Sequence, residues 1–180
     1  PAMPLGERVE VAVRHGHLVG RLDRVPSPRG AAMVLHGING TSAESFVLRT
    51  SRKLQREGRD VLRMNLRGAG ESLGRAAGIT HSGLTDDIRA CVRWLTERYP
   101  RVGMVGFSLG GQLLLRAAGE WGDAPPPEVR AVVSISAPID LERCSAFSER
   151  AAAPVYRWFI VARLRLRYRN LQGALPIEFD

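Results

Sequence analysis

Cysteine is scarce in this sequence, lysine is nearly absent, and long hydrophobic runs are missing. The two cysteines, Cys91 and Cys144, are too few for a disulfide framework, and no metal-binding motif surrounds them. The uncharged run at residues 102–115 is 14 residues long, whereas a helix needs roughly 18 to 20 apolar residues to cross a bilayer. The first residues also lack the apolar core of a secretory signal. We therefore expect a soluble, cytoplasmic protein with no stable membrane insertion.

Basic residues outnumber acidic ones by 26 to 18, and every basic residue except Lys53 is an arginine. The arginines alternate with acidic residues along the chain, whereas a nucleic-acid-binding surface usually requires a basic cluster. We therefore expect no nucleic-acid partner. With 44% hydrophobic and 24% charged residues, the 180-residue chain has the composition of one ordinary globular domain.

Apolar runs alternate with helical patterns along the chain. Two short runs of alternating polarity, at residues 9–13 and 17–22, predict an N-terminal β-hairpin. Buried strands are expected at residues 31–35, 60–66, 102–107 and 129–136, with helices at 44–58, 85–99 and 109–121 between them. This order predicts an α/β fold with a doubly wound, mainly parallel sheet. Thr41 and Glu44 have the spacing of a capping box at the start of the first helix.

The segment Gly106-Phe107-Ser108-Leu109-Gly110 has the G-x-S-x-G pattern of a nucleophile elbow. It lies between a predicted strand and a predicted helix, at the carboxyl end of a parallel strand, where such sheets bind their ligands. In this setting a sharp turn exposes the serine hydroxyl, and the glycines prevent steric clashes in the turn. Ser108 is therefore the candidate nucleophile. The alternative is a glycine-rich turn with a helix-capping serine.

A nucleophilic serine needs N–H donors that bind the oxyanion. One donor is the amide of Leu109, at the start of the helix that follows Ser108. The second is expected from the loop after strand 31–35, where His36 and Gly37 precede Ile38. We interpret the amide of Ile38 as this second donor and His36 as a structural residue rather than a catalytic base.

Five stretches of the sequence, taken in order, carry a family resemblance. They are residues 35–40, 65–72, 81–87, 106–111 and 136–141. Together they resemble the α/β-hydrolase superfamily and, through residues 81–87 and 136–141, its YheT-like esterase branch. The resemblance covers about residues 8–170. One departure is Gln112, which stands where the branch usually has asparagine.

The resemblance implies a serine hydrolase of carboxylic esters whose substrate is a small acyl or lipid-like ester. Ser108 would be the nucleophile, and the amides of Ile38 and Leu109 would bind the oxyanion. We expect neither a cofactor nor a metal ion. The catalytic acid, the acyl chain length and the oligomeric state stay open.

The sequence contains no histidine after the candidate nucleophile. In this superfamily the triad follows the chain order Ser, acid, His, but all four histidines precede Ser108: His15, His17, His36 and His81. His81 is the alternative base, because its loop is expected at the carboxyl edge of the sheet. Asp140 is interpreted as a helix-capping acid at the start of a cap region, residues 139–180.

We therefore predict that residues 1–180 form a single, C-terminally incomplete hydrolase domain that is inactive by itself. A second hypothesis belongs to another class of protein, a non-catalytic α/β-hydrolase-like binding module or an inactive fragment. A downstream Asp and a Gly-His segment would support the enzyme. Residues 154–169, which are aromatic and then rich in alternating arginines, are expected to form an amphipathic element beside the core or a lid.

Overall fold

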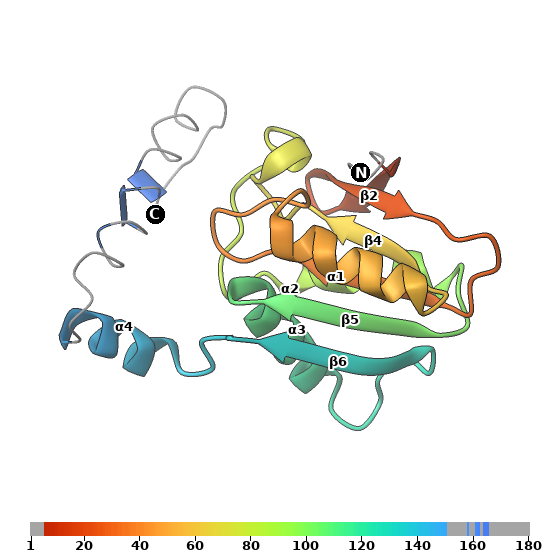
Figure 1. The fold of residues 1–180 in the computed structure, drawn as a ribbon. Coiled ribbons are helices and arrows are strands. Elements are labelled where there is room, and N and C mark those ends of the chain that lie inside the picture. Colours follow the sequence, from red (N-terminus) through yellow and green to blue (C-terminus); the bar gives the residue numbers. More distant parts are fainter. Residues whose placement is uncertain (1–5, 151–157, 159–160, 163, 166–180) are drawn as a thin grey trace. The chain divides into compact units, whose positions relative to one another are not determined.

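The computed structural model describes residues 6–150, 158, 161–162 and 164–165. The chain divides into two compact units, residues 1–137 and residues 138–180. The first unit contains the sheet and all of the candidate site residues (Figure 1).

The first unit is a six-stranded sheet with helices on both faces (Figure 1). The strands lie in the order β1-β2-β4-β3-β5-β6, and β4, β3, β5 and β6 run parallel. The hairpin β1–β2 joins the sheet through an antiparallel pairing of β2 with β4. The strands are β1 (Glu7–Val13), β2 (Gly16–Asp23), β3 (Ala31–Leu35), β4 (Asp60–Met64), β5 (Val102–Phe107) and β6 (Val129–Ile135). The predicted α/β fold, its mainly parallel sheet and its N-terminal hairpin are confirmed.

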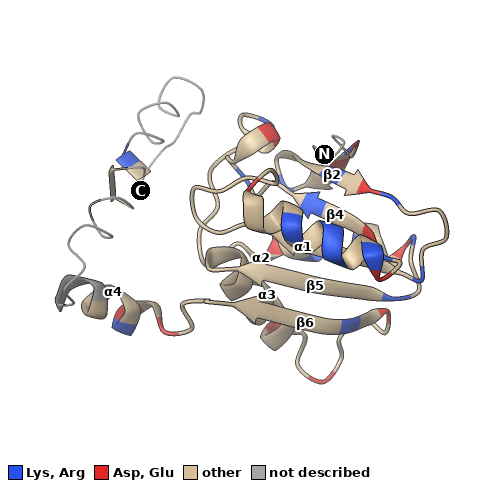
Figure 2. Cartoon of the chain, viewed as in Figure 1, with Lys and Arg blue, Asp and Glu red and all other residues tan. Residues whose placement is uncertain are grey.

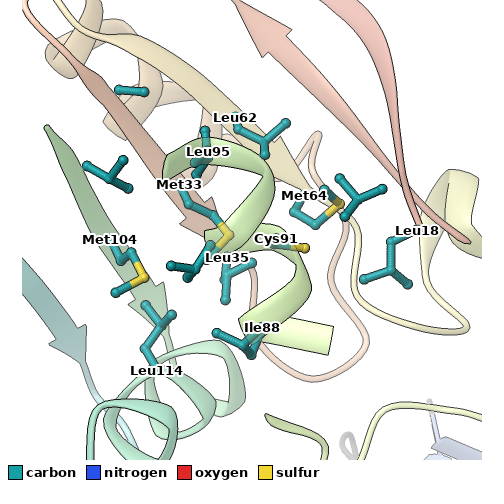
Figure 3. Close-up of a cluster of buried hydrophobic side chains, with 14 of the residues drawn as sticks. Leu18, Met33, Leu35, Leu62, Met64, Ile88, Cys91, Leu95, Met104 and Leu114 are labelled. Atoms are coloured by element: carbon teal, nitrogen blue, oxygen red, sulfur yellow. The ribbon is translucent and has the colours of Figure 1, made fainter. Parts of the chain in front are cut away.

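The main core lies between the sheet and two helices, α2 (Thr85–Thr96) and α3 (Leu109–Trp121). The strands β3 and β4 are buried along their whole length, and every second side chain faces this core. In Figure 3, Met33 and Leu62 from the strands lie near Cys91 and Leu95 of α2. The burial of the Cys91 side chain raises the pKa of its thiol, so this cysteine is unreactive.

The opposite face of the sheet is covered by α1 (Ser45–Arg56). A smaller apolar cluster joins Val47 of this helix to Val34 and Val61 of the strands. The outward side of α1 carries a basic stripe at helical spacing, which Figure 2 shows in blue. The stripe consists of Arg49, Arg52, Lys53 and Arg56. Its last two members lie in the final turn, where cations interact favourably with the helix dipole.

A buried ion pair fixes α1 to the sheet. Arg63 of β4 donates two hydrogen bonds to the carboxylate of Asp23, at 2.6 Å and 2.8 Å. Ser51 of α1 donates to the same carboxylate at 2.6 Å, and Arg63 also donates to the carbonyl oxygen of Ser42 at 2.9 Å. The side chains of Asp23 and Arg63 are 3% and 4% exposed. Removing either charge alone would leave the other one buried without its partner, so the attachment of α1 to the sheet depends on both charges.

Strand β6 departs from the prediction of a buried strand. It is the edge of the sheet, and its Val133 and Ile135 are 45% and 39% exposed. On the α1 side of β5 and β6 the sheet forms a mostly apolar hollow of about 510 Å³, with Arg59, Arg101 and Arg130 among its lining residues. The prediction was wrong because an apolar run predicts a strand, whereas burial of both faces of that strand requires a covering layer over each of them.

The start of α1 also differs from the sequence interpretation. The helix begins at Ser45, and Glu44 is its N-cap residue without a side-chain cap. The hydroxyl of Thr41 accepts a hydrogen bond from the amide of Ala43 instead, in a turn that precedes the helix. The expected capping box was therefore wrong, because Thr41 lies one turn too early to cap a helix that starts at Ser45.

The second unit contains the helix α4 (Leu141–Arg150). The carboxylate of Asp140 accepts a hydrogen bond from the amide of Arg143 at 2.9 Å, so its predicted role as a helix-capping acid is confirmed. Ile139 and Phe147 are 82% and 72% exposed. The amphipathic element expected at residues 154–169 lies mostly outside the described residues. Within the described part of the chain, no helix has the length and apolar character needed to cross a bilayer.

Candidate active site

Ser108 lies in a strained turn between β5 and α3. Its backbone angles are φ 50° and ψ −119°, a region that non-glycine residues rarely occupy and that costs on the order of 1 to 3 kcal/mol. The amide of Ser108 donates to the carbonyl oxygen of Ile135 at 2.8 Å, and its carbonyl oxygen accepts from the amide of Gln112 at 2.9 Å. The turn is therefore held by hydrogen bonds to β6 and to the first turn of α3.

Two glycines allow this turn to pack closely. A Cβ atom on Gly106 would lie 2.6 Å from the carbonyl carbon of Gly110, and a Cβ on Gly110 would lie 2.5 Å from the carbonyl oxygen of His36. Both distances are too short for any side chain. The glycines of the G-x-S-x-G pattern are thus required where α3 begins against β5 and against the loop after β3.

The loop after β3 runs directly beside Ser108. A Cβ on Gly37 would lie 3.0 Å from the Ser108 Cβ and 3.6 Å from its hydroxyl oxygen. Gly37 to Gly40 form a tight turn in which the Gly40 amide donates to the Gly37 carbonyl oxygen at 3.1 Å and Asn39 has φ 58°. Ile38 occupies the second position of this turn and is 43% exposed.

The amides of Ile38 and Leu109 are both available as donors. Within the described part of the chain, the Ile38 amide donates no hydrogen bond to another residue. Leu109 is the first residue of α3, so its amide has no carbonyl oxygen one turn earlier in the helix. The structure thus brings Ser108, Leu109 and the loop of Ile38 together at the carboxyl edge of the sheet, where the helix terminus also favours a negative charge.

His36 is buried between this loop and the loop after β4. Its Nδ1 lies 2.7 Å from the carbonyl oxygen of Gly37, and its Nε2 lies 3.1 Å from the amide nitrogen of Leu66. A carbonyl oxygen can only accept, and a backbone amide can only donate. The ring therefore carries its proton on Nδ1 and is neutral in this arrangement.

The amide of Leu66 belongs to a well-bonded loop. The preceding side chain, Asn65, accepts from the amide of Ser42 at 2.8 Å and donates to the carbonyl oxygen of Val19 at 2.9 Å. The hydroxyl of Ser72 donates to the Asn65 carbonyl oxygen at 2.8 Å. These contacts are buried, so the loop gives His36 a fixed anchor.

The side chain of His81 is hydrogen-bonded within its own loop. Its Nδ1 accepts a hydrogen bond from the amide of Gly83 at 3.1 Å, and its side chain is exposed. The neighbouring Ser82 carbonyl oxygen accepts from the Gln112 side chain at 3.3 Å. Among the described residues, no hydrogen bond joins Ser108 to a histidine.

A second buried ion pair joins two of the motif stretches and was missed by the sequence analysis. Arg67 donates to the carboxylate of Asp87 at 2.9 Å and 2.7 Å, and it also donates to the carbonyl oxygens of Arg14 and Ala77. Arg67 lies in residues 65–72 and Asp87 in residues 81–87. The sequence signal for this pair was that one of the two stretches contains an arginine and the other an acidic residue.

No group of three metal-ligating side chains occurs in the described residues.

Comparisons with known proteins give consistent results. The family described as "alpha/beta hydrolase fold" matches residues 33–171. The chain is 30% identical over 146 residues to Escherichia coli YheT, a protein that bears the name esterase; the match covers 80% of this chain and 42% of YheT. It is 31% identical over 118 residues to a monoacylglycerol lipase of Saccharomyces cerevisiae, covering 64% of this chain and 26% of the lipase. The chain thus spans less than half the length of these curated relatives.

Among solved structures, the esterase Pf2001 of Pyrococcus furiosus superposes with a TM-score of 0.65 at 24% identity. The match covers 87% of this chain and 60% of the esterase. At this identity the likeness concerns the fold, and it supports the same arrangement of sheet and helices.

Proposed function

Because the chain belongs to the α/β-hydrolase family, we propose that it carries the nucleophile and oxyanion-binding amides of a serine hydrolase that cleaves carboxylic esters. The observation that carries the proposal is the strained backbone of Ser108, φ 50° and ψ −119°, between a strand and a helix. Strain of this kind persists only where the surrounding structure enforces it. Here the strained turn holds the half-buried Ser108 beside the loop of Ile38 and directly before Leu109, which supports the proposal.

The reaction would follow the usual course of acyl transfer. The Ser108 hydroxyl oxygen bonds to the ester carbonyl carbon while a general base takes the hydroxyl proton. The amides of Ile38 and Leu109 bind the negative oxygen of the tetrahedral intermediate. The carbon–oxygen bond to the alcohol then breaks, the alcohol leaves with the proton, and a water molecule hydrolyses the acyl-serine by the same steps.

The names of the relatives support an ester of an acyl or lipid-like acid as substrate, since one is called an esterase and another a monoacylglycerol lipase. We propose that residues 139–180 are the beginning of a cap region in a domain that needs no cofactor. A cytoplasmic location remains part of the same proposal. The catalytic acid and histidine would come from sequence that follows Ser108 in the triad order.

A non-catalytic binding module is the second candidate. Within these 180 residues all four histidines precede Ser108, so none of them has the place that the triad order gives to the base. Without a base, the serine hydroxyl is a weak nucleophile at neutral pH. The two candidates differ in whether Ser108 becomes acylated when a base is present.

We expect the 180-residue chain to have little or no activity toward short p-nitrophenyl esters at neutral pH. The physical reason is that all four histidines of these 180 residues precede Ser108, and none of them is hydrogen-bonded to Ser108 among the described residues. The assay should compare the purified chain with its His81→Ala and Ser108→Ala variants. Equal, near-background rates in all three agree with the prediction. Robust hydrolysis by the 180-residue chain that is lost in both variants would identify His81 as the base. It would contradict the prediction that the chain is an incomplete catalyst.

Proline at position 38 should remove one oxyanion donor without disturbing the fold. Ile38 occupies the second position of a turn whose third residue has φ 58°, and proline is favoured at that second position. The substitution deletes the amide hydrogen. In a longer polypeptide that contains these 180 residues with a downstream acid and histidine, called the extended protein below, we expect kcat to fall roughly 10²- to 10³-fold.

The matched control for this prediction is Ile38→Ala, which removes most of the side chain and keeps the amide. It should retain most of the activity of the extended protein. Circular dichroism should establish that both variants are folded. If a folded Ile38→Pro variant turned over substrate at the original rate, another loop would have to supply the donor.

A further inference from the structure

The orientation of the Ile38 amide depends on how the preceding carbonyl is held. No cis peptide occurs in the described residues, so the Gly37 carbonyl and the Ile38 N–H point in opposite directions across one planar unit. The Gly37 carbonyl oxygen accepts from the Nδ1–H of His36 and from the amide of Gly40. The Ile38 N–H must therefore point away from the imidazole ring and from the interior of the turn.

We propose that His36 is a positioning residue for the oxyanion hole. Its neutral ring fixes the Gly37–Ile38 peptide so that the Ile38 amide faces the oxyanion that forms at Ser108. The inference rests on the proposed hydrolase function, and it deepens that function by naming the side chain that sets the direction of one donor. His36 does not touch the reacting atoms and takes no proton from Ser108.

Burial and anchoring make the ring suitable for this role. His36 is 2% exposed, and its Nε2 accepts from the Leu66 amide of the loop after β4. That loop is fixed by the side chain of Asn65, which bridges the segments of Ser42 and Val19. The ring thus connects a rigid loop at one of its nitrogens to the Gly37 carbonyl at the other. A free peptide at this place could rotate and direct its amide elsewhere.

Because Gly37 lies close to Ser108, the orientation of the Gly37–Ile38 peptide matters for catalysis. The position of a Gly37 Cβ would be 3.6 Å from the Ser108 hydroxyl oxygen. A rotation of the next peptide therefore changes which group faces the nucleophile, the amide hydrogen or the carbonyl oxygen. A carbonyl oxygen would repel the oxyanion instead of binding it.

The first test measures the tautomer in the 180-residue chain. Long-range ¹H–¹⁵N NMR correlations of the imidazole rings distinguish a protonated Nδ1 from a protonated Nε2. We expect His36 to have its proton on Nδ1 and to be neutral at pH 7. A proton on Nε2, or on both nitrogens, would overturn the proposal, because the Leu66 amide could then no longer donate to the ring.

The second test uses two variants that each keep one of the contacts. In His36→Asn the side-chain amide can replace the Nδ1–H donor to the Gly37 carbonyl. In His36→Gln the side-chain oxygen can replace Nε2 as the acceptor for Leu66, but the donor to Gly37 is lost. In the extended protein we expect His36→Asn to keep most of the kcat and His36→Gln to lose about 10²-fold in kcat with little change in KM.

His15→Gln, in the turn of the hairpin, is the matched control and should leave kcat unchanged. A purely structural role of His36 would lower the melting temperature in both His36 variants and leave kcat equal in the two folded proteins. That result would overturn the proposal. The order expected here, with Asn retaining activity and Gln losing it, has no explanation in stability alone.

A double variant separates this inference from the proposed function and guards against misfolding. If His36 acts only through the Ile38 amide, His36→Gln should cause little further loss of kcat in an Ile38→Pro background. Additive losses would overturn the positioning role. If the wild-type extended protein does not hydrolyse esters at all, the proposed function fails, whereas an active wild type with a fully active His36→Gln variant contradicts the role of His36 alone.

Discussion

Alanine at position 108 is expected to abolish covalent labelling by a fluorophosphonate probe in the extended protein. The same change should lower kcat toward p-nitrophenyl esters by several orders of magnitude, up to about 10⁶-fold, since the nucleophile of a triad acts as a unit with its base. The reason is the proposed nucleophile itself, the half-buried Ser108 in the strained turn between β5 and α3, which lies beside the loop of Ile38 and directly before Leu109. Gel fluorescence and peptide mass spectrometry measure the labelled site.

Ser136→Gly is the matched control for the labelling experiment. Ser136 directly follows β6, the neighbour of β5, and its φ of 53° suits glycine. The variant should be labelled like the wild type. Labelling that persists in Ser108→Ala would show that another residue is the nucleophile, and absence of labelling in a folded wild-type extended protein would favour the non-catalytic module.

The largest effect on stability is expected from breaking the ion pair between Asp23 and Arg63. Arg63→Met removes both hydrogen bonds to Asp23 and leaves a carboxylate that is 3% exposed with only Ser51 as a donor from this network. The expected loss is roughly 3 to 5 kcal/mol in the free energy of unfolding. Urea denaturation of the 180-residue chain, followed by circular dichroism, measures it.

The double variant Asp23→Leu/Arg63→Met tests the cause. Because it removes both charges, its loss should be clearly smaller than the sum of the two single losses. Glu7→Ala is the control, since the pair of Glu7 with Arg24 is more than half exposed on both sides and should contribute at most about 1 kcal/mol. Additive losses in the double variant would mean that the two charges act independently.

The local pattern of the sequence was sufficient for most of the sheet. The predicted strand 102–107 and helix 109–121 coincide with β5 and α3, because the apolar run and the elbow motif mark the boundary between them. The predicted strand 60–66 extends past β4, which ends at Met64. The last two residues of that prediction, Asn65 and Leu66, instead form the loop that anchors His36.

The contacts that organise the candidate site could not be predicted from local pattern. His36 meets an amide 30 residues away, Arg67 pairs with a carboxylate 20 residues away, and Arg63 pairs with one 40 residues away. Periodicity indicates which residues share a face of one element, but it does not indicate which loops meet. The exposed state of β6 was missed for the same reason, since it depends on neighbours rather than on the strand's own residues.

The strand order has a consequence for synthesis of the chain. After the hairpin and β3 have been made, β4 can pair with both of them, β5 can pair with the free side of β3, and β6 can pair with β5. From β4 onward, each new strand thus finds a partner already translated, and none has to separate two strands that are paired. A chain that folds while it leaves the ribosome therefore extends its parallel sheet outward from β3, and once β5 has been made, the unprotected edge on that side is the strand made most recently.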